Sequence, residues 1–147
     1  NIFLQIVAGG SQGRNNINSG KLFMVLVPIN PITGIEAVEM TQEDICNLVE
    51  KFRDAAVRAK NSGFDGIQIH AAHGYLLSQF LNPFYNKRED EYGGDVDGRA
   101  RILIDVYLSI REAVGDDFIV GMKINCDDFE DEGLNSEKVL GSVKGLL

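Results

Sequence analysis

The 147-residue chain is poor in basic residues and cysteine and has no long apolar run. Its 14 Lys and Arg face 22 Asp and Glu, and the formal net charge of −8 disfavours binding to nucleic acid or anionic membranes. No apolar stretch approaches the roughly 18 residues that cross a bilayer, and the N-terminus lacks the basic and apolar regions of a signal peptide. We therefore expect neither nucleic acid nor a membrane as a partner.

The two cysteines, Cys46 and Cys126, lie far apart in the sequence and belong to no Cys-x-x-Cys motif. This spacing disfavours a disulfide framework or a cysteine-rich metal site and predicts reduced thiols in a cytoplasmic protein. A content of 44% hydrophobic and 24% charged residues is typical of a globular protein, and the length predicts one domain over residues 1–147. Because the chain begins at Asn1 rather than Met, it is expected to be a processed or excised piece.

Apolar strand patterns alternate with amphipathic helix patterns along the chain. Buried strands are expected at residues 2–8, 66–70 and 118–124. Helices are expected after the cap Thr41, over 75–81, along the stripe from Ile102 to Val114, and from the cap Ser136 to Leu147. The run of apolar residues at 22–27 fits either a short strand or a packed loop segment. This alternation predicts an α/β fold of parallel β-α units.

Each predicted strand has one apolar face and one face that carries polar residues, because strand side chains alternate between faces. The polar positions are Gln5 in the first strand, Gln68 and His70 in the second, and Lys123 in the third. If the strands are neighbours, these side chains converge. Active sites of parallel α/β folds lie at the carboxyl ends of the strands, which places His70, His73 and Lys123 in a candidate site.

These residues can be interpreted in more than one way. A metal site at His70 and His73 lacks a third ligand, whereas two imidazole donors can stabilise negative charge on a substrate oxygen. Tyr75 can supply a proton or simply pack. An inward Lys123 favours an anionic ligand, although its ammonium group can also reach solvent, and Gln5 can satisfy a neighbouring backbone group.

The segment GFDGIQIHAAHGYLLSQFLNPFYNKREDEYGGDVDGRARI at residues 63–102, followed by VGMKIN, closely resembles the old yellow enzyme family of flavin-dependent oxidoreductases. The resemblance implies an eight-stranded β/α barrel with FMN at its carboxyl end. It also implies that hydride from NADH or NADPH passes through flavin N5 to an alkene conjugated to a carbonyl. A barrel of this kind needs roughly 250 residues, so the chain is expected to form part of a TIM-type (β/α)8 barrel, truncated at both ends.

The resemblance also implies roles for individual residues. His70 and His73 would hydrogen-bond the carbonyl oxygen of an enone or quinone substrate, and Tyr75 would donate the proton to the α-carbon. Gln5 would contact the flavin pyrimidine ring. Lys123 stands beside flavin N1 and O2, where an arginine is usual, and keeps the charge but not the bidentate fork.

The chain departs from the family pattern at Ala8 and Ser11, where histidine and arginine are common. Two alternatives to the oxidoreductase remain at this point. One is an inactive structural fragment of such an enzyme, and the other is a barrel lyase in which Lys123 forms a Schiff base. An open arc of three strands also leaves edges and an apolar inner face uncovered, which predicts that the isolated piece self-associates or is the ordered part of a longer protein.

Overall fold

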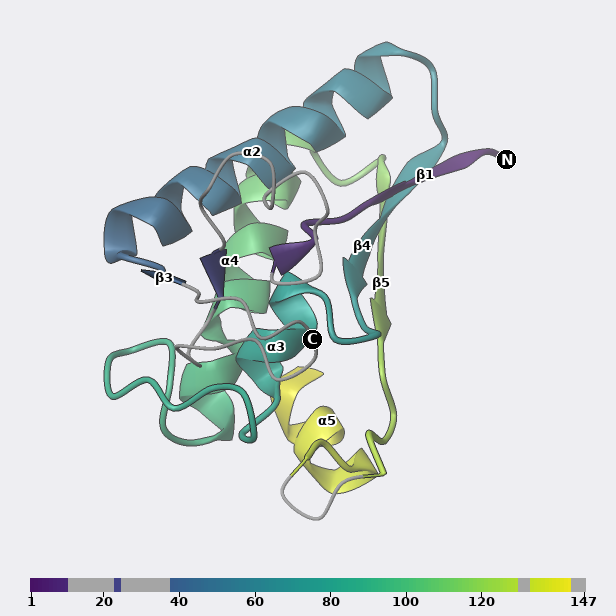
Figure 1. Ribbon diagram of the computed structural model, residues 1–147. Helices are drawn as coiled ribbons and strands as arrows, with labels where there is room; N and C mark the ends of the chain where they lie inside the picture. The colour runs from purple at the N-terminus through teal and green to yellow at the C-terminus, as the bar shows by residue number, and fades with distance from the viewer. Residues whose placement is uncertain (11–22, 25–37, 130–132, 144–147) are drawn as a thin grey trace.

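The computed structural model describes residues 1–10, 23–24, 38–129 and 133–143 (Figure 1). Its main sheet has three parallel strands in the order β1 (Phe3–Ile6), β4 (Gly66–Ala71) and β5 (Ile119–Ile124). β2 (Phe23–Met24) and β3 (Val38–Glu39) form a separate parallel pair. The predicted parallel β-α units are therefore confirmed. Of the apolar run at 22–27, only the two residues of β2 lie within the described residues.

The helices cover one face of the main sheet. α2 (Gln42–Asn61) links β3 to β4, α3 (Leu76–Leu81) and α4 (Val96–Val114) lie between β4 and β5, and α5 (Ser136–Val143) follows β5. Figure 1 shows α2, α3 and α4 on the same side of the sheet, and α2 packs against α4. The opposite face, called here the helix-free face, carries no helix among the described residues.

Side chains near the helix ends fix where the helices begin. Thr41 and Asp44 form a complete capping box, in which the Asp44 amide donates to Thr41 Oγ1 at 3.1 Å and the Thr41 amide donates to Asp44 Oδ2 at 2.9 Å. The predicted cap at Ser136 is wrong, because Ser136 is the first helical residue of α5 and Asn135 Oδ1 accepts the Lys138 amide hydrogen at 3.0 Å. The predicted end of this helix at Leu147 lies outside the described residues.

The hydrophobic core lies between the helices and the sheet. Ile67 and Ile69 of the middle strand are fully buried there, together with residues of α2, α3 and α4. The prediction that all three strands are buried is wrong for β1 and β5, since Phe3 is 45% exposed and Ile119 is 49% exposed. Both side chains belong to strands at the edges of the sheet and point to the face that no described helix covers.

The loop between α3 and α4 is held by buried polar side chains. Asn86 Nδ2 donates to the carbonyl oxygens of Phe80 and Tyr92, each at 2.7 Å. Arg88, which is 7% exposed, donates to the Met40 carbonyl oxygen at 2.8 Å and forms ion pairs with Asp90 and Glu39. These contacts tie the loop to the segment that leads into α2.

Candidate active site

Side chains on the helix-free face form rows, because residues paired in a parallel register point to the same side of the sheet. From the amino to the carboxyl ends of the strands, the rows are Phe3, Gly66 and Ile119; then Gln5, Gln68 and Gly121; then His70 and Lys123. The first row is apolar, the second carries amides and the third carries titratable groups. The predicted convergence of the polar side chains from three strands is thus found in the register.

The amide row is organised by a hydrogen bond between its two glutamines. Gln5 Nε2 donates to Gln68 Oε1 at 2.6 Å, so Gln5 is bound to a side chain of the next strand rather than to the backbone. Each amide keeps further donor and acceptor capacity after this bond is made. The pair can therefore both donate to and accept from a ligand that lies on this face.

His70 is held as a neutral imidazole. It is 5% exposed, and its Nδ1 accepts the backbone N–H of Ala72 at 3.2 Å, which places the ring proton on Nε2. Burial lowers the pKa of His70 below its ordinary value, and the nearby charges of His73 and Lys123 lower it further. His70 consequently offers a ligand one N–H donor at neutral pH.

His73 and Tyr75 both lie against the His70 ring. Each ring centroid is 5.0 Å from that of His70, at an interplanar angle of 82° in both cases. The backbone between them turns through two consecutive left-handed residues, His73 with φ 59° and Gly74 with φ 71°. The turn therefore gathers the two imidazoles and the phenol at the carboxyl end of β4.

Backbone pairing fixes the positions of Tyr75 and Lys123 at this end of the sheet. Tyr75 is the N-cap of α3, and the next amide, that of Leu76, donates to the Ala8 carbonyl oxygen at the end of β1 at 3.1 Å. Lys123 is half-buried and is paired in register with His70 on the neighbouring strand. The site thus combines two imidazoles, one phenol and one cation.

Sequence reasoning missed Asn125, which contacts the cluster, and Asp128, which contacts Asn125. The His73 amide donates to Asn125 Oδ1 at 3.1 Å, and Asn125 Nδ2 donates to Asp128 Oδ1 at 2.7 Å. Asn125 directly follows β5, so the same strand-end rule that selected His70 would have found it. Asp128 carries no comparable signal in the sequence.

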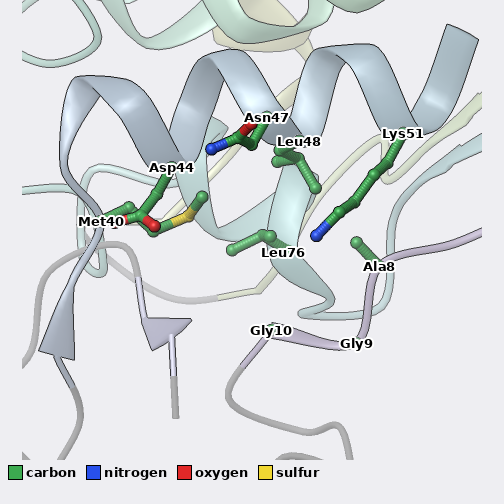
Figure 2. A pocket seen from close by; sticks show the side chains of 9 residues that line it. All are labelled: Ala8, Gly9, Gly10, Met40, Asp44, Asn47, Leu48, Lys51 and Leu76. Carbon is green, nitrogen blue, oxygen red and sulfur yellow. The ribbon is translucent and has the colours of Figure 1, made fainter. Parts of the chain in front are cut away.

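A pocket of about 330 Å³ lies away from this cluster, between the end of β1 and the first turns of α2. In the view of Figure 2, the Lys51 side chain reaches down from α2 and its ammonium group lies between Leu76 and Ala8, whereas Asp44 lies on the opposite side of the pocket. The Asp44 carboxylate is engaged in the capping box. None of the sequence-predicted site residues lines this pocket.

Comparison with known proteins assigns the family. Residues 2–145 match the NADH:flavin oxidoreductase / NADH oxidase family. The chain belongs to this family. It is 38% identical over 143 residues to an NADH oxidase of Thermoanaerobacter brockii, a match that covers 93% of this chain and 21% of that protein. It is 44% identical over 109 residues to an NADPH dehydrogenase of Bacillus licheniformis, which covers 74% of this chain and 32% of the relative.

A solved family member confirms the resemblance and the fold. The old yellow enzyme homologue of Zymomonas mobilis superimposes with a TM-score of 0.84 at 27% identity, over 99% of this chain and 44% of that structure. The sheet and helices described here form part of a TIM-type barrel. The chain spans about a fifth to a third of the length of the two curated relatives. Among the described residues, no helix is both long enough and apolar enough to cross a membrane.

The helix-free face fits the flavin that the family name implies. One edge of a flavin pyrimidine ring alternates carbonyl acceptors with an N–H donor, which the amide groups of Gln5 and Gln68 can match. Among the described residues, an added Cβ at Gly121 would meet only the Ile67 carbonyl oxygen, at 3.7 Å, so this part of the sheet has room for a flat ring beside the glutamines. Lys123 adds a positive charge one row further on.

Proposed function

We propose that the protein to which this sequence belongs is an FMN-dependent ene reductase. The observation that carries the proposal is the cluster of His70, His73 and Tyr75 at the carboxyl end of β4, next to Lys123. Bound FMN, reduced by NADH or NADPH, would supply the hydride that reduces a small enone or quinone. The residues of this chain would bind the substrate carbonyl, protonate the product and hold the flavin edge.

The two histidines are suited to bind the substrate carbonyl. When an alkene conjugated to a carbonyl accepts hydride at its β-carbon, negative charge develops on the carbonyl oxygen. Hydrogen-bond donors fixed beside that oxygen strengthen as the charge grows and so lower the barrier. His70 donates through Nε2–H, because its Nδ1 is engaged by the Ala72 amide, and His73 lies 5.0 Å away between ring centroids.

Tyr75 is the group proposed to supply the proton. Its ring is half-buried and packs edge-on against His70, so its hydroxyl belongs to the same cluster that binds the carbonyl. Proton transfer from the phenol to the α-carbon completes the reduction of the double bond. His70 is unsuited to this task because its lowered pKa keeps it neutral.

Gln5, Gln68 and Lys123 are proposed to hold the flavin. The glutamine pair would hydrogen-bond the pyrimidine edge, and the Lys123 ammonium would stabilise negative charge near N1 and O2 of the reduced ring. The ammonium group of a lysine supplies this charge without the bidentate hydrogen bonds that an arginine guanidinium can make. A lyase in which Lys123 forms a Schiff base would leave the two histidines and Tyr75 without a role.

The test uses the full-length protein loaded with FMN and compares two oxidants of the reduced flavin. A cyclic enone needs its carbonyl polarised, whereas ferricyanide does not. Replacing both histidines (H70Q/H73Q) is expected to slow reoxidation by the enone at least on the order of a hundredfold, with a much smaller effect on ferricyanide. Failure of the enone to reoxidise the wild-type flavin would overturn the proposal.

Two further measurements separate the alternatives. Tyr75→Phe is expected to slow enone reduction while substrate still binds, since the phenol acts only in proton transfer. Borohydride treatment in the presence of a carbonyl ligand gains permanent mass at Lys123 only if that residue forms an imine. FMN titration of the 147-residue chain, followed by flavin fluorescence, tests whether this part alone retains cofactor affinity.

A further inference from the structure

We propose that Asn125 is a positioning residue that holds His73 in the conformation needed to bind the substrate carbonyl. The inference deepens the proposed function and rests on it for the role of His73. It is carried by a chain of hydrogen bonds that joins the segment after β4 to the segment after β5. Asn125 meets this turn at the backbone N–H of His73, so we expect its effect on the imidazole to pass through the His73 backbone.

The backbone of His73 requires support. Its φ of 59° lies in the left-handed region of backbone conformation, which residues other than glycine rarely adopt. Such a conformation persists where surrounding contacts determine it, and it is common at ligand-binding turns. The contact found here is the hydrogen bond from the His73 amide to Asn125 Oδ1 at 3.1 Å.

The orientation of the Asn125 amide is itself fixed. A carboxylate only accepts hydrogen bonds, so Asp128 Oδ1 selects the Nδ2 end of Asn125, at 2.7 Å, and turns the oxygen end toward His73. Were the amide flipped, its oxygen would face the carboxylate and its Nδ2 would face the His73 N–H. The hydrogen bond to Asp128 therefore decides which atom of Asn125 meets the turn.

Asp128 is in turn held from two sides. Its Oδ2 accepts from Asn82 Nδ2 at 2.7 Å, at the end of α3, and from the Leu134 amide at 3.3 Å. The Asp128 amide donates back to the Leu134 carbonyl oxygen at 3.0 Å. Three segments thus converge on one carboxylate, and a pocket of about 270 Å³ lined by His73, Asn82 and Asp128 lies directly beside it.

The first experiment measures the exchange of the His73 amide hydrogen in the full-length protein. Asn125→Ala removes the acceptor, and hydrogen exchange at the His73 amide, followed by NMR, is expected to accelerate at least on the order of tenfold. Asn135→Ala is the matched control, because the Asn135 side chain caps α5 by accepting the Lys138 amide hydrogen, so this substitution removes a cap outside the His73 turn. Unchanged exchange at His73 in Asn125→Ala would overturn the inference.

An exchange of the two polar side chains tests the orientation argument. Asn125→Asp alone places two carboxylates face to face, and Asp128→Asn alone removes the acceptor that orients Asn125. The double variant N125D/D128N restores an amide donor opposite a carboxylate and keeps an oxygen at residue 125 for the His73 amide. Slow exchange at His73 is expected to be lost in both single variants and regained in the double variant.

The last measurement connects positioning to catalysis in the full-length protein loaded with FMN. Asn125→Ala is expected to lower the ratio of enone to ferricyanide reoxidation rates by roughly tenfold, because a misplaced donor no longer meets the carbonyl oxygen. Faster His73 exchange with an unchanged ratio would overturn the positioning role. A wild-type protein that reduces no enone would instead overturn the proposed function, whatever the His73 amide does.

Discussion

His70 is a side chain whose protonation state depends on the surrounding structure. Burial, followed by the charges of His73 and Lys123, lowers its pKa from the ordinary 6.5. Protonation of Nδ1 would also break the bond from the Ala72 amide. NMR titration of the His73→Gln variant, which leaves His70 as the only imidazole of the chain, is expected to give a pKa below 6.5.

The same shift links pH to stability. Between the lowered pKa and 6.5 the unfolded chain binds more protons than the folded chain. This contribution to stability is therefore complete above pH 6.5 and is lost as the pH falls through that value. Urea denaturation at several pH values should show a shallower dependence in His70→Gln than in wild type. A His70 pKa at or above 6.5 would contradict the proposed neutral donor.

Two glycines on the helix-free face should respond differently to an added methyl group. At Gly66 a Cβ would lie 2.5 Å from the Ile119 carbonyl oxygen and 2.6 Å from Phe3 Cε1, whereas at Gly121 the nearest atom of the described residues, the Ile67 carbonyl oxygen, is 3.7 Å away. Gly66→Ala is expected to lower the free energy of unfolding by about 1–3 kcal/mol through overpacking. Gly121→Ala should fold at least as well as wild type and, if the flavin lies over this strand, bind FMN more weakly.

The loop that joins α3 to α4 depends on one buried cation. Arg88 is 7% exposed and contacts Met40, Glu39 and Asp90, so Arg88→Ala removes a bond to the backbone and two ion pairs at once. We expect a loss of about 3 kcal/mol in the free energy of unfolding, measured by urea denaturation. Arg53→Ala is the control, because the exposed pair of Arg53 with Asp54 is worth less than about 1 kcal/mol. Equal losses in the two variants would contradict the role given to burial.

A structural feature could be predicted from the sequence where residues close together in the chain determine it. The alternation of Gln68 and His70 with Ile67 and Ile69 follows from strand geometry, and the register then brought the polar row together as expected. The exposure of Phe3 was not predicted, because burial depends on which elements cover a strand and not on its own residues. Ser136 and Asn135 are adjacent and both suited to capping, so sequence alone does not choose between them.

The candidate site was predictable in part for the same reason. His70, His73 and Tyr75 belong to one short segment, and their proximity follows from a single turn after β4. The bonds from Asn125 and Asp128 join segments 52 and 46 positions apart in sequence, so they depend on how three loops meet. Neither strand alternation nor helix periodicity reports on such loops.

The molecule as a whole has an apolar surface that its described helices do not cover. Phe3 is 45% exposed and Ile119 is 49% exposed, and both point to the helix-free face, on the edge strands β1 and β5. In a complete barrel of this type the inward side chains are packed in layers contributed by all eight strands. This chain covers 44% of the solved family member, so more than half of that structure has no counterpart here.

We propose that the 147-residue chain, studied alone, associates with itself through the helix-free face. Free strand edges and exposed apolar side chains both favour pairing between copies. Light scattering coupled to size exclusion is expected to show a mass that rises with concentration, and Phe3→Glu and Ile119→Glu should each shift the distribution toward the monomer. Leu108→Glu, at a side chain 56% exposed on α4, is the control and should leave the mass unchanged. A single monomer at high concentration would count against association, and equal effects of all three substitutions would place it on another surface.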